Sequence, residues 1–465
     1  MKKYIYIISF LAAFTLTGCS KWLAVNDNPN YVSDADVQLL MPTAQLITAD
    51  KVGYDISLVG YFWSQYVIQN KTTSQYTTIM NNDLSVSTSY FTRPWSYTYA
   101  RTLPTLKTIL DKCNGKDGYS NFVLEAKVME AYNLYMLTSL YDKVAYKEGP
   151  MSDSFNANPS FETGIQMQEI ILGILEDVRS MDAAAVAADE ATNSSATADM
   201  VFSGDTDSWF QFANTLYLKL LLRDFTTNKT KIQSLLAEDN FLDADAAFDK
   251  FLDAADKSNP LYENDRRGLN TKLNIRCCSD ILNVLSANDP RLEYYYVGGG
   301  SGEPYGTSAD PAVSNLLNIA ATDAVYFSTV DEAHFLKAEA YARLNDATNA
   351  KSSYEAAVTA AFTRCGCTGA DTFLAGDYAF TAGTTEQMLE QILNQKWAAN
   401  VRCMPIESWF DINRTGYPAV GTVLTDFTGV LDGRPVRFLY PEDSAINNVN
   451  SPEVEPMTAK MWWHK

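Results

Sequence analysis

Few side chains in this chain carry the chemistry that catalysis needs. Only two histidines occur, His334 and His464, and they lie far apart in the sequence. Histidine is the usual general base of a Ser-His-Asp triad and a common zinc ligand, so two distant copies argue against a triad or a histidine-rich metal site. Acidic residues are so numerous that no carboxylate pair stands out as the machinery of a glycoside hydrolase. We therefore expect no enzymatic activity.

Cysteine is the other reactive residue type here. Six of the seven cysteines follow the N-terminal region, namely Cys113, Cys277, Cys278, Cys365, Cys367 and Cys403. Their local spacings, CC and CGC, are not typical of zinc sites, and this favours structural or free thiols over a metal site. In an oxidising compartment six cysteines can pair, but the sequence does not determine the pairing. We expect no cofactor, and the sequence leaves open whether a structural calcium ion binds among the aspartates.

The seventh cysteine, Cys19, follows an apolar leader. Lys2 and Lys3 precede the run YIYIISFLAAFTL, and the small residue Gly18 comes just before the cysteine. This order predicts a signal peptide over residues 1–18. The apolar run is shorter than the ~20 residues that a membrane-spanning helix needs.

The stretch LTGC resembles the lipobox of bacterial lipoproteins, in which Cys19 becomes the acylated first residue of the mature protein. Acyl chains on one cysteine bury enough methylene groups in lipid to hold a soluble domain at a bilayer. An ordinary signal peptide, with Cys19 as a bystander, is the alternative.

The remaining chain reads as one acidic body. Residues 19–33 are polar and turn-rich and predict an extended tether, and no further linker rich in glycine, serine or proline follows. We therefore expect a single body over 34–465. The formal net charge of −20 disfavours binding to nucleic acid and to anionic lipid surfaces.

Long helices are the elements expected to build this body. Residues 121–143 and 208–224 repeat apolar side chains at helical spacing. In the second segment Trp209, Phe212 and Leu216 share one stripe. Segments 161–181 and 385–401 are further helix candidates.

Residues 331–362 contain the clearest repeat unit. Ala338 and Tyr341 lie in its first helix, LND forms a turn, and Ala350, Tyr354 and Ala357 lie in its second helix. These offsets are those of a tetratricopeptide repeat, in which small residues allow close helix approach. A generic helical hairpin is the alternative. One repeat cannot bury its own apolar face, so other hairpins must stack on it.

The fold class predicted from these patterns is mostly α, a tetratricopeptide-like helical-hairpin scaffold with a loop-rich second lobe. The helical elements are expected over about 34–225 and 326–412. Residues 226–325 and 413–465 show few regular patterns and are expected to form the irregular lobe.

Several ordered segments together resemble the SusD-like family of nutrient-binding outer-membrane lipoproteins. They are GDTDSWFQFANTLYLKLLLR, DPRLEYYY, EAHFLKAEAYARL, NQKWAANVRCMPIESWFDINRTGYP and RPVRFLYPEDSAINNVN. The resemblance covers nearly the whole mature chain and implies a non-catalytic protein. Such a protein is lipid-anchored in the outer membrane, faces the cell exterior and passes glycans or other nutrients to a TonB-dependent, SusC-like barrel transporter. The repeat half of the fold is then expected to contact the barrel.

Most residues of these motifs are expected to build the fold. Trp209, Phe212, Trp397 and Trp409 have core spacing, and Asp411 and Arg414 are expected to form an internal ion pair.

Ligand residues are instead expected on loops, because sugar C–H faces pack on aromatic rings and their hydroxyls need polar partners. Two aromatic runs that read as loops, 76–99 and 293–306, supply the candidates. These are Tyr76, Asn81, Asp83, Tyr90, Arg93, Trp95, Tyr294, Tyr295, Tyr296 and Tyr305. Adjacent residues of a strand face opposite sides, so the three consecutive tyrosines are not all expected to face one ligand. The alternative is that these aromatic residues cover the core.

Two other functions stay open at this point. In the first, the protein has the same role but its ligand is a peptide rather than a glycan. In the other the chain is a repeat-type scaffold for protein partners without a small ligand.

Overall fold

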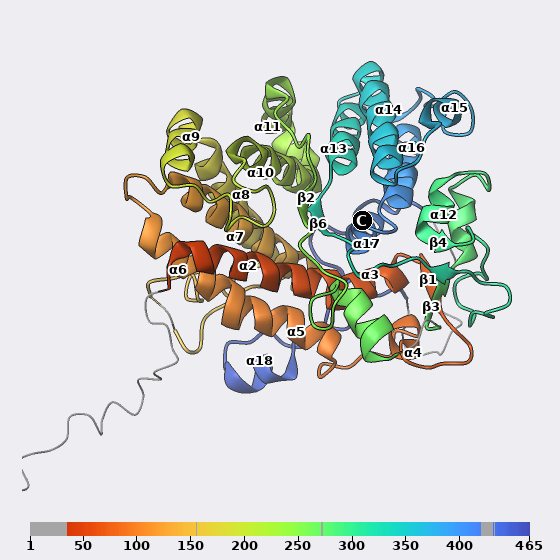
Figure 1. Cartoon of the computed structure of the whole chain (residues 1–465), viewed down its shortest axis with the longest axis horizontal. Coiled ribbons are helices and arrows are strands. Elements are labelled where there is room, and N and C mark those ends of the chain that lie inside the picture. Colours follow the sequence, from red (N-terminus) through yellow and green to blue (C-terminus); the bar gives the residue numbers. More distant parts are fainter. Residues whose placement is uncertain (1–34, 155, 271–272, 420–430, 432) are drawn as a thin grey trace, which may run out of the picture.

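The computed structural model describes residues 35–154, 156–270, 273–419, 431 and 433–465. The predicted signal peptide, Cys19 and the tether 19–33 lie outside the described residues. Figure 1 shows a mostly helical molecule, as predicted, with a few short strands. Within the described part, no helix combines the length and the apolar character that crossing a bilayer requires.

The N-terminal half is a layered set of helices, drawn in red to yellow-green in Figure 1. Its helices are α2 (Val37–Lys51), α3 (Ser57–Trp63), α4 (Thr77–Met80), α5 (Ser89–Tyr97), α6 (Leu103–Cys113), α7 (Ser120–Tyr141), α8 (Gly164–Arg179), α9 (Ala183–Thr192), α10 (Thr206–Leu221) and α11 (Phe225–Glu238). Two π-helical turns, η3 (Val52–Ile56) and η4 (Thr98–Thr102), and the 3₁₀ turn η5 (Leu222–Asp224) join some of them. Helices α6, α7, α8 and α10 pack on one another in sequence order.

The predicted repeat unit forms the hairpin of α13 (Val330–Arg343) and α14 (Ala347–Arg364). Ala338, Ala350 and Ala357 are buried between its helices, and the Tyr354 hydroxyl donates a hydrogen bond to the Tyr378 carbonyl at 3.0 Å. Three further helices lie against or beyond this hairpin, namely α15 (Ala370–Leu374), α16 (Thr385–Ala399) and α17 (Pro405–Thr415). The hairpin that the sequence predicted is therefore present, and α16 packs on it.

Short strands and turns connect the helices; Figure 1 shows β2 and β6 between the two helical groups, and β1, β3 and β4 at one side of the molecule near α12. One antiparallel sheet has the order β1-β3-β5-β4, and a second pairs β2 with β6. The strands are β1 (Val67–Gln69), β2 (Ala246–Phe248), β3 (Ile275–Cys277), β4 (Tyr296–Val297), β5 (Leu316–Leu317) and β6 (Val325–Ser328). The helical turns here are η6 (Tyr262–Gly268), η7 (Ser279–Asn283) and α12 (Arg291–Tyr295), and α18 (Glu442–Asn447) lies near the C-terminus.

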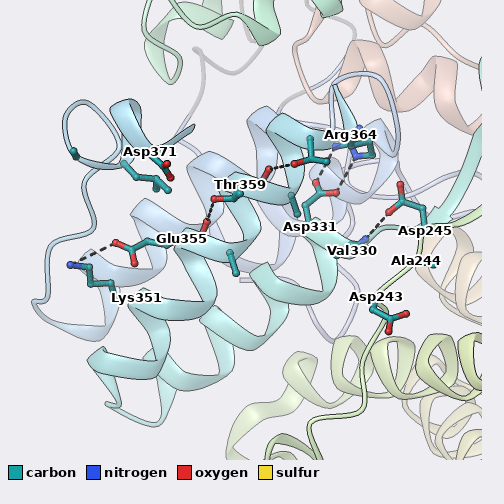
Figure 2. Close-up of a pocket in the computed structure, with 15 residues that line it drawn as sticks. Asp243, Ala244, Asp245, Val330, Asp331, Lys351, Glu355, Thr359, Arg364 and Asp371 are labelled. Carbon is teal, nitrogen blue, oxygen red and sulfur yellow. Dashed lines mark hydrogen bonds and ion pairs between the residues drawn. The ribbon is translucent and has the colours of Figure 1, made fainter. Parts of the chain in front are cut away.

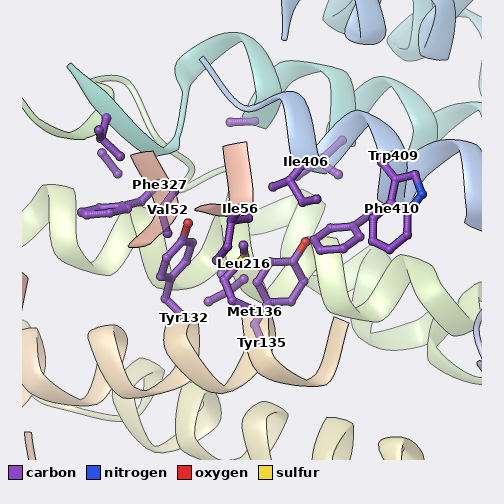
Figure 3. Close-up of a cluster of buried hydrophobic side chains, with 14 of the residues drawn as sticks. Val52, Ile56, Tyr132, Tyr135, Met136, Leu216, Phe327, Ile406, Trp409 and Phe410 are labelled. Carbon is purple, nitrogen blue, oxygen red and sulfur yellow. The ribbon is translucent and has the colours of Figure 1, made fainter. Parts of the chain in front are cut away.

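The core forms where the N-terminal helices meet α17. Figure 3 shows side chains of η3, α7, α10, β6 and α17 in one cluster. The ring centroids of Trp63 and Trp409 lie 5.1 Å apart, and those of Tyr135 and Phe410 lie 6.1 Å apart with nearly perpendicular planes. Because α17 lies late in the sequence, these contacts tie the two ends of the described chain into one core.

Two sequence predictions were wrong about local structure. Residues 76–99 are not a loop, because α4 and α5 occupy much of the run. Phe91, Pro94, Trp95 and Thr98 follow helical spacing and bury one face of this segment. The many Ser and Thr residues and Pro94 obscured that stripe.

The second correction concerns the start of the irregular lobe. Helix α11 occupies the first part of 226–325, because Ile232, Leu235 and Leu236 supply a narrow buried stripe in a polar sequence. The irregular structure begins only after this helix.

Candidate functional site

Four of the predicted ligand residues are buried in the protein. The Tyr76 hydroxyl donates to the Asp265 carboxylate at 2.8 Å, and the Tyr296 hydroxyl donates to the Tyr66 carbonyl at 2.8 Å. Trp95 packs against other rings, with its centroid 4.7 Å from that of Tyr99. Tyr295 is fully buried. For these four residues the burial favours the alternative that they form part of the core.

The other predicted residues are accessible to different degrees and do not form one group. Asn81 is half-buried and Asp83 is exposed in the turn after α4. Tyr294 lies under the Arg402 guanidinium, whose carbon is 4.2 Å from the ring centroid. Tyr305 is half-buried, and its hydroxyl makes no hydrogen bond to any residue that the structure describes. Their role in ligand binding stays a prediction.

Tyr90 and Arg93 are the two predicted residues that the structure brings together. The Tyr90 ring meets the Tyr54 ring edge to face at a centroid distance of 6.4 Å. The Arg93 guanidinium carbon lies 5.9 Å from the Tyr54 centroid and 5.1 Å from the Tyr97 centroid. One helical turn beyond Tyr97, the guanidinium carbon of Arg101 lies 4.5 Å from the Tyr97 ring centroid. Helix α5 and η4 thus present a row of arginine and tyrosine side chains, because positions four apart lie on one helix face.

A cleft opens beside this row. Its volume is about 560 Å³, within the range of small-ligand pockets. One wall comes from α2 and from the α5–η4 helix, and the other comes from β2, the segment after it and η6. The lining residues are Leu46, Ile47, Asp50, Tyr97, Arg101, Phe248, Lys250, Phe251, Leu252, Asp256, Lys257, Ser258, Pro260, Glu263 and Asn264.

Two buried or half-buried carboxylates hold Arg93 in place behind the cleft. Arg93 Nη1 lies 3.2 Å from Asp55 Oδ2, and Nη2 lies 3.1 Å from Asp50 Oδ2. Burial raises the pKa of Asp55 to about 7, although the Arg93 charge acts to lower it. Burial alone would lower the pKa of Arg93, but Asp55 and Asp50 outweigh it and raise the pKa. The guanidinium therefore stays charged, with its carbon 5.1 Å from the Tyr97 ring centroid.

The cleft has the chemistry of a site that binds a ligand with both apolar faces and polar groups. Tyr97, Phe248 and Phe251 supply aromatic surface, although most of the two phenylalanine side chains is buried. Arg101, Asn264 and Asp50 supply hydrogen-bonding groups at the same cleft. Sugars present this combination of C–H faces and hydroxyls.

A second, larger groove lies along the repeat hairpin. It has a volume of about 1010 Å³ and runs beside one face of α14, as Figure 2 shows. Asp331 and Arg364 form an ion pair at its inner end, with Oδ2 and Nη2 3.0 Å apart, and Lys351 lies 3.7 Å from Glu355. Its lining residues, all within the described part of the chain, include no aromatic ring. This groove therefore offers a sugar much less stacking surface than the cleft does.

Sequence reasoning missed most of the cleft. Tyr97 lies inside the aromatic run 76–99, so a helical reading of that run would have placed it one turn from Arg93. Phe248 and Phe251 lie in the acidic stretch DADAAFDKFLDAADK, where their spacing carries no signal. Only the fold brings that stretch opposite α5.

The described residues contain no disulfide and no cluster of metal-binding side chains. The six cysteines after Cys19 are free thiols, and all but Cys367 are buried. Within the same described ranges, no group of three or more histidine, cysteine and acidic side chains is arranged to hold a metal ion.

Comparison with known protein families finds one whose model matches most of this chain. The model of a SusD-like family, described as "Starch-binding associating with outer membrane", matches residues 29–441. A search of curated proteins found no match.

Solved structures share the fold. A SusD homolog from Bacteroides uniformis superposes with a TM-score of 0.73 at 21% identity, covering 93% of this chain and 100% of its own. A chitin-binding SusD homolog from Flavobacterium johnsoniae gives a TM-score of 0.73 at 20% identity, covering 91% and 97%. A SusD-like protein named Bacteroidetes AC2a gives 0.75 at 18% identity, covering 93% and 100%. These likenesses confirm the helical scaffold that the sequence predicted.

Proposed function

The chain belongs to the SusD-like family of outer-membrane-associated, nutrient-binding proteins, and on this premise we propose that its cleft binds an oligosaccharide for delivery to a TonB-dependent transporter. The protein is then a binding component without catalysis of its own. The acylated Cys19 holds it at the outer membrane with its body facing the cell exterior, and the transporter is its partner.

The aromatic lining of the cleft is the observation that carries this proposal. Tyr97 is half-buried at the cleft beside the largely buried Phe248 and Phe251, whereas no aromatic ring lines the described groove of the repeat hairpin. Aromatic side chains are well suited to the apolar faces of sugars, and arginine, asparagine and aspartate are suited to their hydroxyls. One solved relative is named as chitin-binding, and this agrees with a glycan ligand.

A protein partner suits the groove of the repeat hairpin better. The groove is open, and the α14 face along it carries the small side chains Ala356, Thr359, Ala360 and Thr363. Small side chains allow a partner backbone to approach closely. We propose this face as a contact with the transporter. The same protein then combines ligand binding with the protein-binding role of the scaffold alternative. A peptide ligand in the cleft is the remaining alternative.

The test of the glycan proposal is binding by the full-length protein in detergent. A glycan array identifies ligands, and calorimetry measures their affinity for the wild type, for Tyr97→Ala and for Tyr341→Ala. Tyr341 is half-buried on α13, outside the residues that line the cleft, so it controls for loss of a tyrosine.

We expect Tyr97→Ala to weaken glycan binding by about tenfold, since aromatic contacts contribute about 1 kcal/mol or more beyond their buried area. Tyr341→Ala should bind as the wild type does. Binding to peptides but not to glycans would replace the ligand class, and equal affinity of all three proteins would remove the cleft as the site.

The transporter proposal needs a separate measurement. Tagged protein extracted gently from its own outer membranes should co-purify with a TonB-dependent barrel, identified by mass spectrometry. Recovery of the protein alone would contradict a stable complex.

A further inference from the structure

The charges at the cleft differ from those of the molecule as a whole. The chain has a net charge of −20, yet the cleft is lined by three basic residues and three acidic ones. The basic residues are Arg101, Lys250 and Lys257, and the acidic residues are Asp50, Asp256 and Glu263. A locally balanced surface on a strongly acidic protein is unexpected if the charges serve solubility alone.

Partners outside the cleft engage two of the acidic residues. Asp50 pairs with Arg93 at 3.1 Å, and Glu263 lies 3.5 Å from Arg267. Neither Arg93 nor Arg267 lines the cleft. Arg93 is shared with Asp55, and Arg267 is shared with Asp253, so each of these two carboxylates is compensated in part.

Two of the basic residues have no such partner. Arg101 is exposed and rests on the Tyr97 ring, and Lys257 is exposed on the opposite wall. Within the described residues, neither side chain forms an ion pair with a carboxylate, whereas Lys250 pairs with Asp249 at 2.6 Å. Asp256 likewise has no ion pair with a described residue. Arg101 and Lys257 are thus the two cations of the cleft without a carboxylate at ion-pair distance among the described residues, although Arg101, with Arg93, acts to lower the pKa that burial raises at Asp50.

The position of Arg101 also orients it. The guanidinium carbon of Arg101 lies 4.5 Å from the Tyr97 ring centroid and the side chain is exposed, so its N–H edge is accessible to other groups. Such an edge matches the oxygens of a carboxylate or a sulfate and donates two parallel hydrogen bonds to them. A neutral hydroxyl uses only part of that donor set.

From this geometry, and resting on the glycan function proposed above, we propose that the cleft selects oligosaccharides carrying carboxylate or sulfate groups, with Arg101 as the residue that binds the anionic group. Tyr97, which is half-buried, then contacts the sugar rings, and Lys257 attracts the same anion or a second one from the other wall. The overall negative charge does not prevent this contact, because at physiological ionic strength charges farther apart than about 8 Å are largely screened.

The experiment compares sugars that differ only in charge. The full-length protein in detergent is titrated with oligogalacturonides and with their methyl esters, which share a backbone and differ in the carboxylate. A second pair, sulfated carrageenan oligosaccharides and the same oligosaccharides after chemical desulfation, tests sulfate in the same way. The glycan array covers ligands outside these two pairs.

The matched variants are Arg101→Gln and Lys229→Gln. Lys229 is an exposed cation on α11 and does not line the cleft, so its variant makes the same change in net charge elsewhere. We expect the charged member of at least one pair to bind about tenfold more tightly than its neutral analogue. Arg101→Gln should remove most of this difference, and Lys229→Gln should retain it. Rising salt should weaken only the charged ligand.

The outcomes separate the two proposals. Equal or tighter binding of the neutral members, or an array on which only neutral glycans bind, overturns anion selection and leaves glycan binding intact if Tyr97→Ala weakens it. Anion preference that survives in Arg101→Gln overturns the assigned contact. If the protein binds no glycan of either kind, the proposed function fails and this inference fails with it.

Discussion

Glu130 on α7 is a carboxyl almost fully enclosed by the protein. The Tyr146 hydroxyl donates to its Oε1 at 2.8 Å. Burial raises the pKa of Glu130 to about 7, although this hydrogen bond and Lys127 act to lower it. The carboxyl has a pKa of 4.5 in the unfolded chain, so between pH 4.5 and about pH 7 the native protein keeps a proton that the unfolded chain has lost. The stability from this proton is complete below pH 4.5 and is lost as pH rises to 7, by about 1.4 kcal/mol per pH unit.

Glu130→Gln should therefore remove this part of the pH dependence. We expect the free energy of unfolding of the wild type, minus that of the variant, to fall steadily from pH 5 to pH 7. Urea unfolding at pH 5, 6 and 7 measures it, and Glu169→Gln makes the same substitution at an exposed position as the control. A constant difference for Glu130→Gln would show that the carboxyl ionises normally.

The burial of individual side chains was the least predictable feature of the site. Tyr294, Tyr295 and Tyr296 are adjacent and chemically identical, yet the structure leaves the first half-exposed and buries the other two. The chain passes from α12 into β4 at this point, and the change of backbone direction decides which ring faces the core. By contrast, the expected packing of Trp209, Trp397 and Trp409 and the Asp411–Arg414 ion pair are confirmed. Those residues lie on long helices, where spacing alone fixes the buried face.

Helices α3 and α17 pack closely against each other at Gly60. A Cβ at this position would lie 2.5 Å from the backbone nitrogen of Ile406 and 2.7 Å from its Cα. The Ser64 hydroxyl donates to the Pro405 carbonyl at 2.8 Å just beside it. A methyl group here has to push two helices apart, because the backbone of α17 has no rotamer to change.

Gly60→Ala should consequently destabilise the protein by about 1–3 kcal/mol or more. Gly173→Ala is the matched control, since nothing lies within 4 Å of a Cβ on that residue in the middle of α8. We expect the control to gain about 0.5–1 kcal/mol from the better helix propensity of alanine. Thermal unfolding measures both, and a neutral Gly60→Ala would mean that α3 and α17 move apart at little cost.

Elements were predictable where their apolar pattern was strong. The helices expected at 121–143, 161–181, 208–224 and 385–401 are confirmed as α7, α8, α10 and α16 within a few residues. The pattern failed at α5 and α11, where serine, threonine or charged residues surround a narrow buried stripe. The cleft sits beside α5, so the missed helix and the missed site have the same cause.

At the scale of the whole molecule, a buried ionic network joins the two helical groups. Lys219 of α10 lies 2.8 Å from Glu332 of α13 and 3.2 Å from Glu407 of α17. Lys396 of α16 lies 2.8 Å from Asp411 and 3.4 Å from the same Glu332. The sequence showed an excess of acidic residues but not which of them pair inside, because these partners come from four different helices.

Lys396 is almost fully buried and contacts two carboxylates of this network. Burial alone would lower its pKa, but the carboxylates of Asp411, Glu332 and Glu407 outweigh burial and raise it, so the ammonium is charged at neutral pH. Lys396→Met would leave Asp411 with Arg414 and Glu332 with Lys219 in a site with almost no exposure.

Removing one partner of a buried pair costs about 3–5 kcal/mol, and we expect Lys396→Met to lose about that much stability in urea unfolding. The exposed Lys351→Met on α14 makes the same substitution with a partner only at 3.7 Å, and should change stability by less than about 0.5 kcal/mol. Because the network spans α10, α13, α16 and α17, circular dichroism and tryptophan fluorescence should still report one shared transition in the variant. A loss confined to one probe would show instead that the repeat hairpin unfolds apart from the N-terminal helices, and the network would then serve only local packing.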